Sequence, residues 1–369
     1  MKRFAMGLLV VGILCFAGNP RARAQDEVRY YDRAAKQEAK ASGSIQSESP
    51  SQIVLKQGAG TKTIPAVDII EVVYKVGDLV NLKYRGARLN ENTAYSGASA
   101  DERKKAVGFA LSKYKEMLPD VNDAKVKKHF EFTIARLLAR EAEEDSDKAR
   151  TAMGKLEQFM KDHPESWQIS ACAKVLAQLQ MDQKDFSAAL KTYETLAQTP
   201  KISKEIRQEC DLMTAQVLMA DSKFADAEAK LQALSQTVPS DDPQAIRIQV
   251  SLAQCMAATN KIEQAVPKLE GIIAKTTDTD LKALAYNSLG DCYRAAKKPE
   301  DALWAYLWVD VVYHQNRQEH AKALYWLAKL FKERGDETKS KQCRDRLEKD
   351  KQFAGLEFQR LAASEKTEK

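Results

Sequence analysis

The sequence predicts a mainly α-helical protein, a solenoid of helical hairpins preceded by a small β-sheet or barrel-like module. Two observations predict this fold class. Small residues recur in pairs at a fixed step through the second half of the chain, which is typical of stacked helix–turn–helix units. Short runs of β-branched and aromatic residues, separated by Gly, Ser and Pro, occupy residues 28–75 and are typical of strands.

The repeat appears as a small residue followed, twelve positions later, by a second small residue. The steps between the first members of successive pairs are 38, 38, 37 and 38 residues. We interpret each pair as the place where the two helices of one hairpin touch, since small side chains permit close approach. The pairs are Ala177/Ala189, Ala215/Ala227, Ala253/Ala265, Gly290/Ala302 and Ala328/Ser340.

Residues 283–316 form the clearest unit, two amphipathic helical runs joined by a short polar break. The residues that share a face are Tyr286, Leu289, Gly290 and Tyr293 in the first run, and Ala302, Tyr306 and Val309 in the second. This unit resembles the tetratricopeptide (TPR) repeat, with Tyr286 in place of the leading Trp and without the closing Pro. The period exceeds the ~34 residues of the common TPR, so a related repeat remains an alternative. The resemblance implies a curved array whose first helices line an inner, concave wall.

The chain is expected to divide into five parts. The length of the chain supports a division, because 369 residues exceed what one compact core usually needs. The parts are a signal peptide (1–24), a small β-rich module (25–76), irregular helical hairpins (77–164), five TPR-like repeats (165–349), and a capping helix with a disordered tail from Ser364 (350–369).

The first 24 residues predict a signal peptide. A basic start and an apolar run precede Ala22-Arg23-Ala24, which matches the small-x-small cleavage pattern, so the mature chain would begin near Gln25. The apolar run is shorter than the ~20 residues that span a bilayer. An uncleaved anchor is the alternative. We expect an exported protein, most simply periplasmic, that is not an integral membrane protein after cleavage.

Net charge and cysteine content give no support for a nucleic-acid partner, a disulfide framework or a metal site. The formal net charge is +6, but residues 1–24 contribute four basic residues and no acid, which leaves +2. Net charge therefore gives no support for a nucleic-acid partner. Five cysteines remain after cleavage, an odd number, and neighbours in the array are too far apart for disulfides. We expect them to pack as small hydrophobes, with no metal site.

Within the N-terminal parts, three local predictions can be compared with a structure. Gln57-Gly58-Ala59-Gly60 predicts a hairpin turn. Residues 32–41 could form a short helix inside the module instead of strand. Residues 90–100, rich in Asn, Ser and Gly, predict a loop after a first helix.

The sequence gives no positive sign of catalysis. Its four histidines lie in no HExxH pattern, and no Gly-rich phosphate loop or Gly-x-Ser-x-Gly elbow occurs. We therefore expect no enzyme activity and no cofactor. The leading hypothesis is an exported scaffold that binds an envelope protein or peptide. The alternative is a cell-wall or carbohydrate-associated envelope factor with the β module as its binding part; the oligomeric state is left open.

Candidate binding residues follow from the implied inner wall. Positions four and seven apart share a helix face, and the wall they define is rich in amides, which suit the backbone of an extended peptide. Solvated helix positions are the alternative. The candidates are Lys174, Gln178, Gln216, Gln254, Asn287, Asp291, Arg294, Tyr325 and Lys329.

Trp304 and Trp308 are a second candidate surface. They lie four residues apart, off the face that carries Ala302 and Tyr306. Exposed indoles would mark an interface. The alternative is that the next unit or the N-terminal module covers them.

Overall fold

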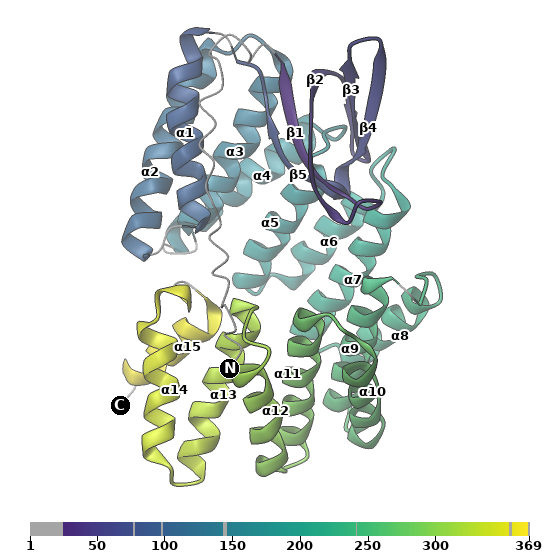
Figure 1. Cartoon of the computed structure of the whole chain (residues 1–369), viewed down its shortest axis with the longest axis vertical. Helices are drawn as coiled ribbons and strands as arrows, with labels where there is room; N and C mark the ends of the chain where they lie inside the picture. Colours follow the sequence, from purple (N-terminus) through teal and green to yellow (C-terminus); the bar gives the residue numbers. More distant parts are fainter. Residues whose placement is uncertain are drawn as a thin grey trace, which may run out of the picture.

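The computed structural model describes residues 25–76, 78–96, 99–142, 146–240, 242–353 and 356–367, so the predicted signal peptide lies outside the described residues. Five strands come first, and helical hairpins follow along a curved array (Figure 1). Both ends of the array, α1–α2 and α14–α15, lie on one side of Figure 1, and α7–α10 lie on the other. The predicted fold class is confirmed.

The β module is a five-stranded antiparallel sheet in the order β4-β3-β2-β1-β5. The long strand β2 pairs with β1 through its first half and with β3 through its second, and its register shifts between Ile45 and Ser47. A 3₁₀ turn (Ala66–Asp68) returns the chain to the far edge of β1. The strands are β1 (Asp26–Asp32), β2 (Gln37–Ser49), β3 (Gln52–Gln57), β4 (Gly60–Pro65) and β5 (Ile69–Val73).

The hairpin turn between β3 and β4 is where the sequence predicts it. Gln57 pairs with Gly60, and Gly58 has a φ of 58°, a backbone conformation that glycine adopts without a steric penalty. The alternative helix at residues 32–41 is wrong: the chain turns at residues 33–36 and β2 begins at Gln37. The cause is tertiary pairing, since β1 provides a complete antiparallel partner for this segment.

The helices pair into hairpins from α1 onward. The irregular hairpins are α1 (Asp78–Ser96) with α2 (Ala100–Met117), and α3 (Ala124–Ala142) with α4 (Ala149–Asp162). The regular repeats are α5 (Ile169–Asp182) with α6 (Phe186–Ala197), α7 (Lys204–Ala220) with α8 (Phe224–Ser235), α9 (Pro243–Ala258) with α10 (Ile262–Lys275), α11 (Thr279–Ala295) with α12 (Pro299–Val311), and α13 (Arg317–Glu333) with α14 (Glu337–Lys349).

The prediction of a loop from residue 90 onward is wrong, because α1 continues to Ser96. Its polar side chains bond back to carbonyls of the preceding turn instead of breaking the helix: Asn90 Nδ2 donates to the Gly86 carbonyl at 2.9 Å, and Ser96 Oγ to that of Asn92 at 2.8 Å. Residues 97–98 lie outside the described part.

Small residues hold the paired helices close together, as the repeat pattern predicts. The alanines of the first three pairs are fully buried at 0% exposure. In the last pair, Ser340 Oγ donates to the Ala328 carbonyl at 2.7 Å, a contact that requires the two helices to touch. In the fourth pair, a Cβ added to Gly290 would lie 2.6 Å from the ring of Tyr306, itself fully buried.

The turns inside the five repeats share one backbone solution. Each contains a residue with positive φ, and the amide of the following residue donates to a carbonyl five positions back, which closes the helix end. Only the last turn uses glycine. The residues are Lys184 (59°), Ser222 (59°), Asn260 (63°), Lys297 (57°) and Gly335 (82°), spaced at the repeat period.

The last helix, α15 (Glu357–Thr367), covers the end of the array by packing on α13 and α14. The prediction of a disordered tail from Ser364 onward is wrong, because α15 continues to Thr367. Glu365 explains the order: its Oε1 accepts from Tyr325 OH at 2.6 Å and lies 2.8 Å from Lys329 Nζ. Residues 368–369 lie outside the described part.

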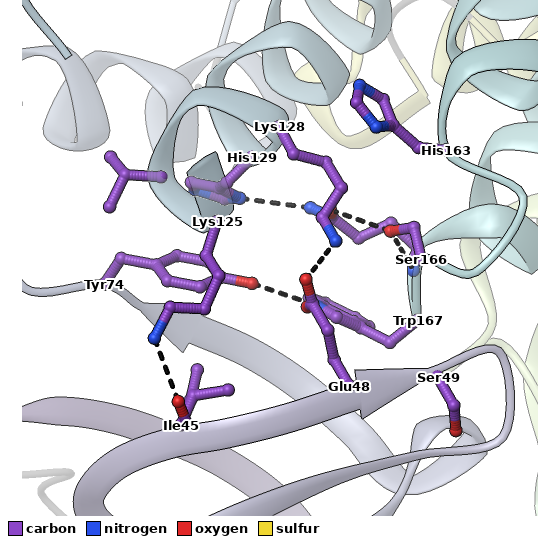
Figure 2. A network of polar contacts seen from close by, with 12 residues as sticks. Ile45, Glu48, Ser49, Tyr74, Lys125, Lys128, His129, His163, Ser166 and Trp167 are labelled. Atoms are coloured by element: carbon purple, nitrogen blue, oxygen red, sulfur yellow. Dashed lines mark hydrogen bonds and ion pairs between the residues drawn. The ribbon is translucent and has the colours of Figure 1, made fainter. Parts of the chain in front are cut away.

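The β module shares its hydrophobic core with the first helices. One continuous cluster runs from Val28 and Ile53 of the sheet through Phe130 of α3 to Leu176 of α5. A polar seam beside it joins β2 to α3, and joins Tyr74, which follows β5, to the α4–α5 connection (Figure 2). The module is therefore an integral end of the solenoid.

The seam contains a buried ion pair. The side chains of Glu48 and Lys128 are 8% and 9% exposed and contact each other, while the second carboxylate oxygen of Glu48 has no hydrogen-bond partner. Nearby, Lys125 Nζ donates to the Ile45 carbonyl at 2.9 Å, and Trp167 Nε1 donates to Tyr74 OH at 3.0 Å (Figure 2).

All five cysteines from Cys172 onward are buried and free of disulfides, as expected. Burial raises the pKa of Cys210 to about 12 and that of Cys255 to about 11, so these thiols stay protonated and unreactive at neutral pH. No described helix is long and apolar enough to span a bilayer.

Gly290→Ala should destabilise the protein by about 1–3 kcal/mol, because the new methyl group meets the buried Tyr306 ring. Gly271→Ala is the matched control: it lies inside α10 with no atom within 4 Å of the added Cβ, so it should be neutral or stabilising by up to ~1 kcal/mol. Urea unfolding compares the two. Equal losses would contradict the close-contact explanation.

Lys297→Gly should stabilise the protein by about 0.5–1 kcal/mol, since the left-handed conformation costs a side-chain-bearing residue about 1–2 kcal/mol and glycine only its entropy. The reverse exchange at the equivalent turn, Gly335→Ala, should cost about 1 kcal/mol. Thermal unfolding of both variants reports the sign. A destabilised Lys297→Gly would show that its side chain contributes more than its backbone strain costs.

Lys128→Met should cost about 3–5 kcal/mol, because it leaves the Glu48 carboxylate buried without a cation. Lys128→Met combined with Glu48→Leu should recover most of that loss, since neither charge is then desolvated. A double-mutant cycle by urea unfolding measures the coupling. Additive losses in the cycle would show that the two side chains do not stabilise each other.

Candidate binding groove

A cavity of about 300 Å³ lies along the first helices of the middle repeats. It crosses from α7 over α9 to α11 and reaches the start of α13, so four consecutive hairpins contribute to one continuous groove. Its lining residues are Gln216, Met219, Arg247, Val250, Ser251, Gln254, Asp280, Leu284, Asn316 and Glu319.

The groove follows from the repeat geometry. Gln216 and Gln254 directly follow Ala215 and Ala253, the small residues that touch the second helices, so each glutamine points away from its own hairpin contact. Met219, one turn further along α7, adds an apolar surface beside them. The groove thus combines amide donors and acceptors with apolar side chains, the chemistry that recognises an extended peptide backbone.

Hydrogen bonds fix two of the polar groups. Gln254 Nε2 donates to Ser288 Oγ at 2.8 Å, and Ser288 Oγ donates to the Leu284 carbonyl at 2.8 Å. Asn287 Nδ2 donates to Glu319 Oε2 at 2.7 Å and to the Glu319 carbonyl at 2.9 Å. These bonds link α9 to α11 and α11 to α13, so the groove wall is held in place before any partner arrives.

Charged groups lie at the groove edges. Arg247 is exposed and forms an ion pair with none of the described residues, and the same is true of Asp280. Glu319 presents a carboxylate that Asn287 orients. A cation and two carboxylates on one wall can read the charge pattern of a bound segment.

The sequence-predicted residues fall into three groups. Gln216 and Gln254 line the groove. Lys174 and Gln178 lie earlier on α5, outside the cavity, where Lys174 Nζ contacts Glu209 Oε1 at 2.6 Å and Gln178 Nε2 donates to Asp182 Oδ1 at 2.9 Å. The remaining inner-wall residues lie toward the C-terminal end and are occupied by contacts within the array.

Asn287, Asp291 and Arg294 all contact neighbouring elements. Asn287 is fully buried and orients Glu319. Asp291 accepts from Tyr306 OH and from Lys322 Nζ, both at 2.6 Å. The Arg294 guanidinium lies over the ring of Trp326 at 3.0 Å from its centroid, so these three side chains join α11 to α12 and α13.

Tyr325 and Lys329 face the capping helix, where both bond Glu365. They line a second cavity of about 280 Å³ between α13, α14 and α15. The first helix of the last repeat is therefore covered here by the chain's own C-terminal helix.

Trp304 and Trp308 lie outside the groove, on α12, the second helix of the fourth repeat. Neither the next repeat nor the N-terminal module covers them, so that alternative is wrong. Trp304 is 65% exposed and Trp308 46% exposed. The Trp308 ring stacks on Tyr286 at 5.7 Å between centroids and lies 6.3 Å from Tyr313.

Sequence reasoning missed Arg247, Asp280 and Glu319. Arg247 lies seven residues before Gln254, so helical periodicity carried one turn further would have found it. Asp280 and Glu319 lie in the first turns of the following helices. Asp280 lies seven residues before Asn287, so the same periodicity would have found it, whereas Glu319, six residues before Tyr325, lies off the face that periodicity predicts.

No group of three or more His, Cys, Asp or Glu side chains in the described ranges is arranged to hold a metal ion. The half-buried His129 has a structural role. Burial lowers its pKa to about 3, and its ring lies against that of Tyr74 in the seam, tilted by 39°, with 4.9 Å between the centroids. It is a neutral packing residue at physiological pH.

Comparison with known proteins agrees with this geometry. Residues 203–309, from α7 to α12, match the family model of the tetratricopeptide repeat-like domain. A tetratricopeptide repeat protein from Parabacteroides merdae ATCC 43184 superimposes with a TM-score of 0.51 at 12% identity, over 76% of this chain and 99% of that one. The fold is a TPR-like solenoid.

Two further solved structures are similar at lower scores. A Rap protein complexed with Competence and Sporulation Factor has a TM-score of 0.48 at 14% identity, over 72% of this chain and 76% of that one. PilW, a type IV pilus biogenesis factor, has a TM-score of 0.40 at 16% identity, over 63% and 98%. At such identities the likeness concerns the fold alone. No curated protein sequence matches the chain.

Proposed function

We propose that this protein is an exported, non-enzymatic scaffold that binds an extended segment of an envelope protein in the α7–α9–α11 groove. The observation that carries the proposal is the groove itself, a cavity of about 300 Å³ with amide, apolar and charged side chains on one wall. TPR-like folds commonly mediate protein–protein interaction, which gives the coarse class of partner.

Preorganisation is the mechanism. Gln254 is held by Ser288, and Glu319 is held by Asn287, so binding freezes few side chains of the scaffold. A bound segment would lie across three first helices, contact Met219 and Leu284 with apolar side chains, and place polar groups toward Arg247 and Asp280.

The rival candidate places the binding surface on the β module, as a carbohydrate-associated factor would require. A cavity of about 350 Å³ does lie between β1, β2, β5 and α1. Its charged side chains are paired with one another: Arg29 Nη1 contacts Glu71 Oε2 at 3.0 Å, and Lys40 Nζ contacts Glu27 Oε1 at 3.3 Å. Unpaired charge in the α7–α11 groove favours the groove.

Export follows from the predicted signal peptide. The N-terminal sequence of protein recovered from the periplasmic fraction of a bacterial host should begin near Gln25. Recovery of only the intact N-terminus in the cytoplasmic fraction would contradict export, and it would leave the groove assignment to its own experiment.

Gln216→Trp with Arg247→Glu should abolish partner capture without loss of stability, because both side chains are exposed and only the groove changes. The measurement is site-specific photo-crosslinking in envelope extract from a probe at Met219, with mass spectrometry of the captured segment. Thr195→Trp on the exposed side of α6 is the matched control and should leave capture intact. Capture that persists in the groove variant, or that follows Arg29 and Lys40 substitutions instead, would contradict the proposal.

A further inference from the structure

The outer surface of α12 carries an apolar stripe that the fold leaves largely exposed to solvent. Trp304 and Val311 are 65% and 66% exposed, and Trp308 lies between them at 46%. The three residues are spaced four and three apart and so share one helix face. The buried face of α12, which includes Ala302, Tyr306 and Val309, lies elsewhere on the helix.

Comparison with the other repeats shows that the array does not require this stripe. Trp304, Trp308 and Val311 lie 2, 6 and 9 residues after Ala302, the second small residue of the fourth repeat. In each of the other four repeats, the corresponding positions hold small or polar residues. They are Lys191, Thr195 and Gln198 on α6; Ala229, Ala233 and Gln236 on α8; Pro267, Gly271 and Ala274 on α10; and Gln342, Arg346 and Lys349 on α14. Large apolar side chains at these positions are specific to the fourth repeat.

We infer that the α12 stripe is a self-association surface on which a second copy of this chain packs antiparallel about a two-fold axis near Trp308. The stripe is self-complementary in shape. Antiparallel pairing places Trp304 of one copy against the smaller Val311 of the other, and Trp308 against its own equivalent. An isologous contact of this kind closes as a dimer.

Charge is complementary in the same arrangement. Asp301, exposed in the first turn of α12, would lie opposite the end of the other copy's α12. At that end Lys282 Nζ lies 5.5 Å from the centroid of the Tyr313 ring, and the residue that follows Tyr313 in the chain, His314, is exposed. Each copy thus presents an acid at one end of the stripe and a cation at the other, so antiparallel packing pairs unlike charges twice. Parallel packing would pair like charges.

The area fits a weak dimer. At their exposed fractions, two indoles of roughly 200 Å² each, with Val311 and the 39% exposed Val312, give roughly 400 Å² of apolar surface per copy. A pair with its polar rim would bury on the order of 1,000 Å², near the lower limit of specific interfaces. The rigid stack of Trp308 on Tyr286 lowers the entropy that ordering the surface would cost.

Sedimentation velocity over a hundredfold concentration range reaching ~0.1 mM tests the inference, because interfaces of this size are typical of weak, transient association. The wild-type chain should shift from monomer to dimer. Trp304→Lys with Val311→Gln, the residues that α6 carries at these positions, should remain monomeric with unchanged circular dichroism and thermal unfolding. Leu89→Gln on α1, a side chain 68% exposed, is the matched control and should still dimerise.

Orientation has its own readout. Asp301→Cys with His314→Cys should form a disulfide between copies under mild oxidation, whereas Asp301→Cys alone should not, because residues 301 face each other only in parallel packing. The native thiols of the array are buried and do not compete. A wild-type chain that stays monomeric throughout, a dimer that survives in the Trp304→Lys/Val311→Gln variant, or a crosslink through Asp301→Cys alone would overturn the inference.

Discussion

The close approach of paired helices at small residues is the constraint on which the rest of the structure depends. Gly290 allows the Tyr306 ring to lie where any side chain would collide with it, and Ser340 reaches the Ala328 carbonyl directly. Because the two helices of each hairpin touch at the equivalent position, the first helices of successive repeats present the same face to the inner wall. The groove is therefore a product of repetition, and its chemistry varies only with the residue that each repeat places next to its small position.

The solenoid was predictable because its signal is periodic and local. Ala177, Ala215 and Ala253 report helix contacts at a fixed step, and no long-range information is needed to recognise them. The β module was predictable as strands, but the particular contacts that join it to α3 were not, because the pairing of Glu48 with Lys128 joins residues 80 positions apart. Local propensity also failed in α1, where Asn90 and Ser96 satisfy their side chains against the helix itself.

The candidate site divides in the same way. Gln216 and Gln254 could be found from their offset to the repeat alanines, whereas Glu319 lies off the predicted face of α13 and reaches the groove through the packing of α13 against α11. Several predicted inner-wall residues have another use. Asp291 binds Tyr306 and Lys322, so a polar residue on the expected face served as an interhelical contact. The position of a residue in the repeat predicts which helix face it lies on. Whether its side chain is available to a partner depends on the residues that pack against it.

The continuous core of the sheet and the first helices has a consequence for how the chain acquires its structure. The sheet is made first during synthesis, yet its buried face needs Phe130 and its seam needs Lys128 and Trp167, which follow much later in the chain. The N-terminal strands therefore stay incompletely covered until α3 and α5 have been synthesised. This delay makes synthesis of the fifth helix the step that commits the N-terminal end to its final form.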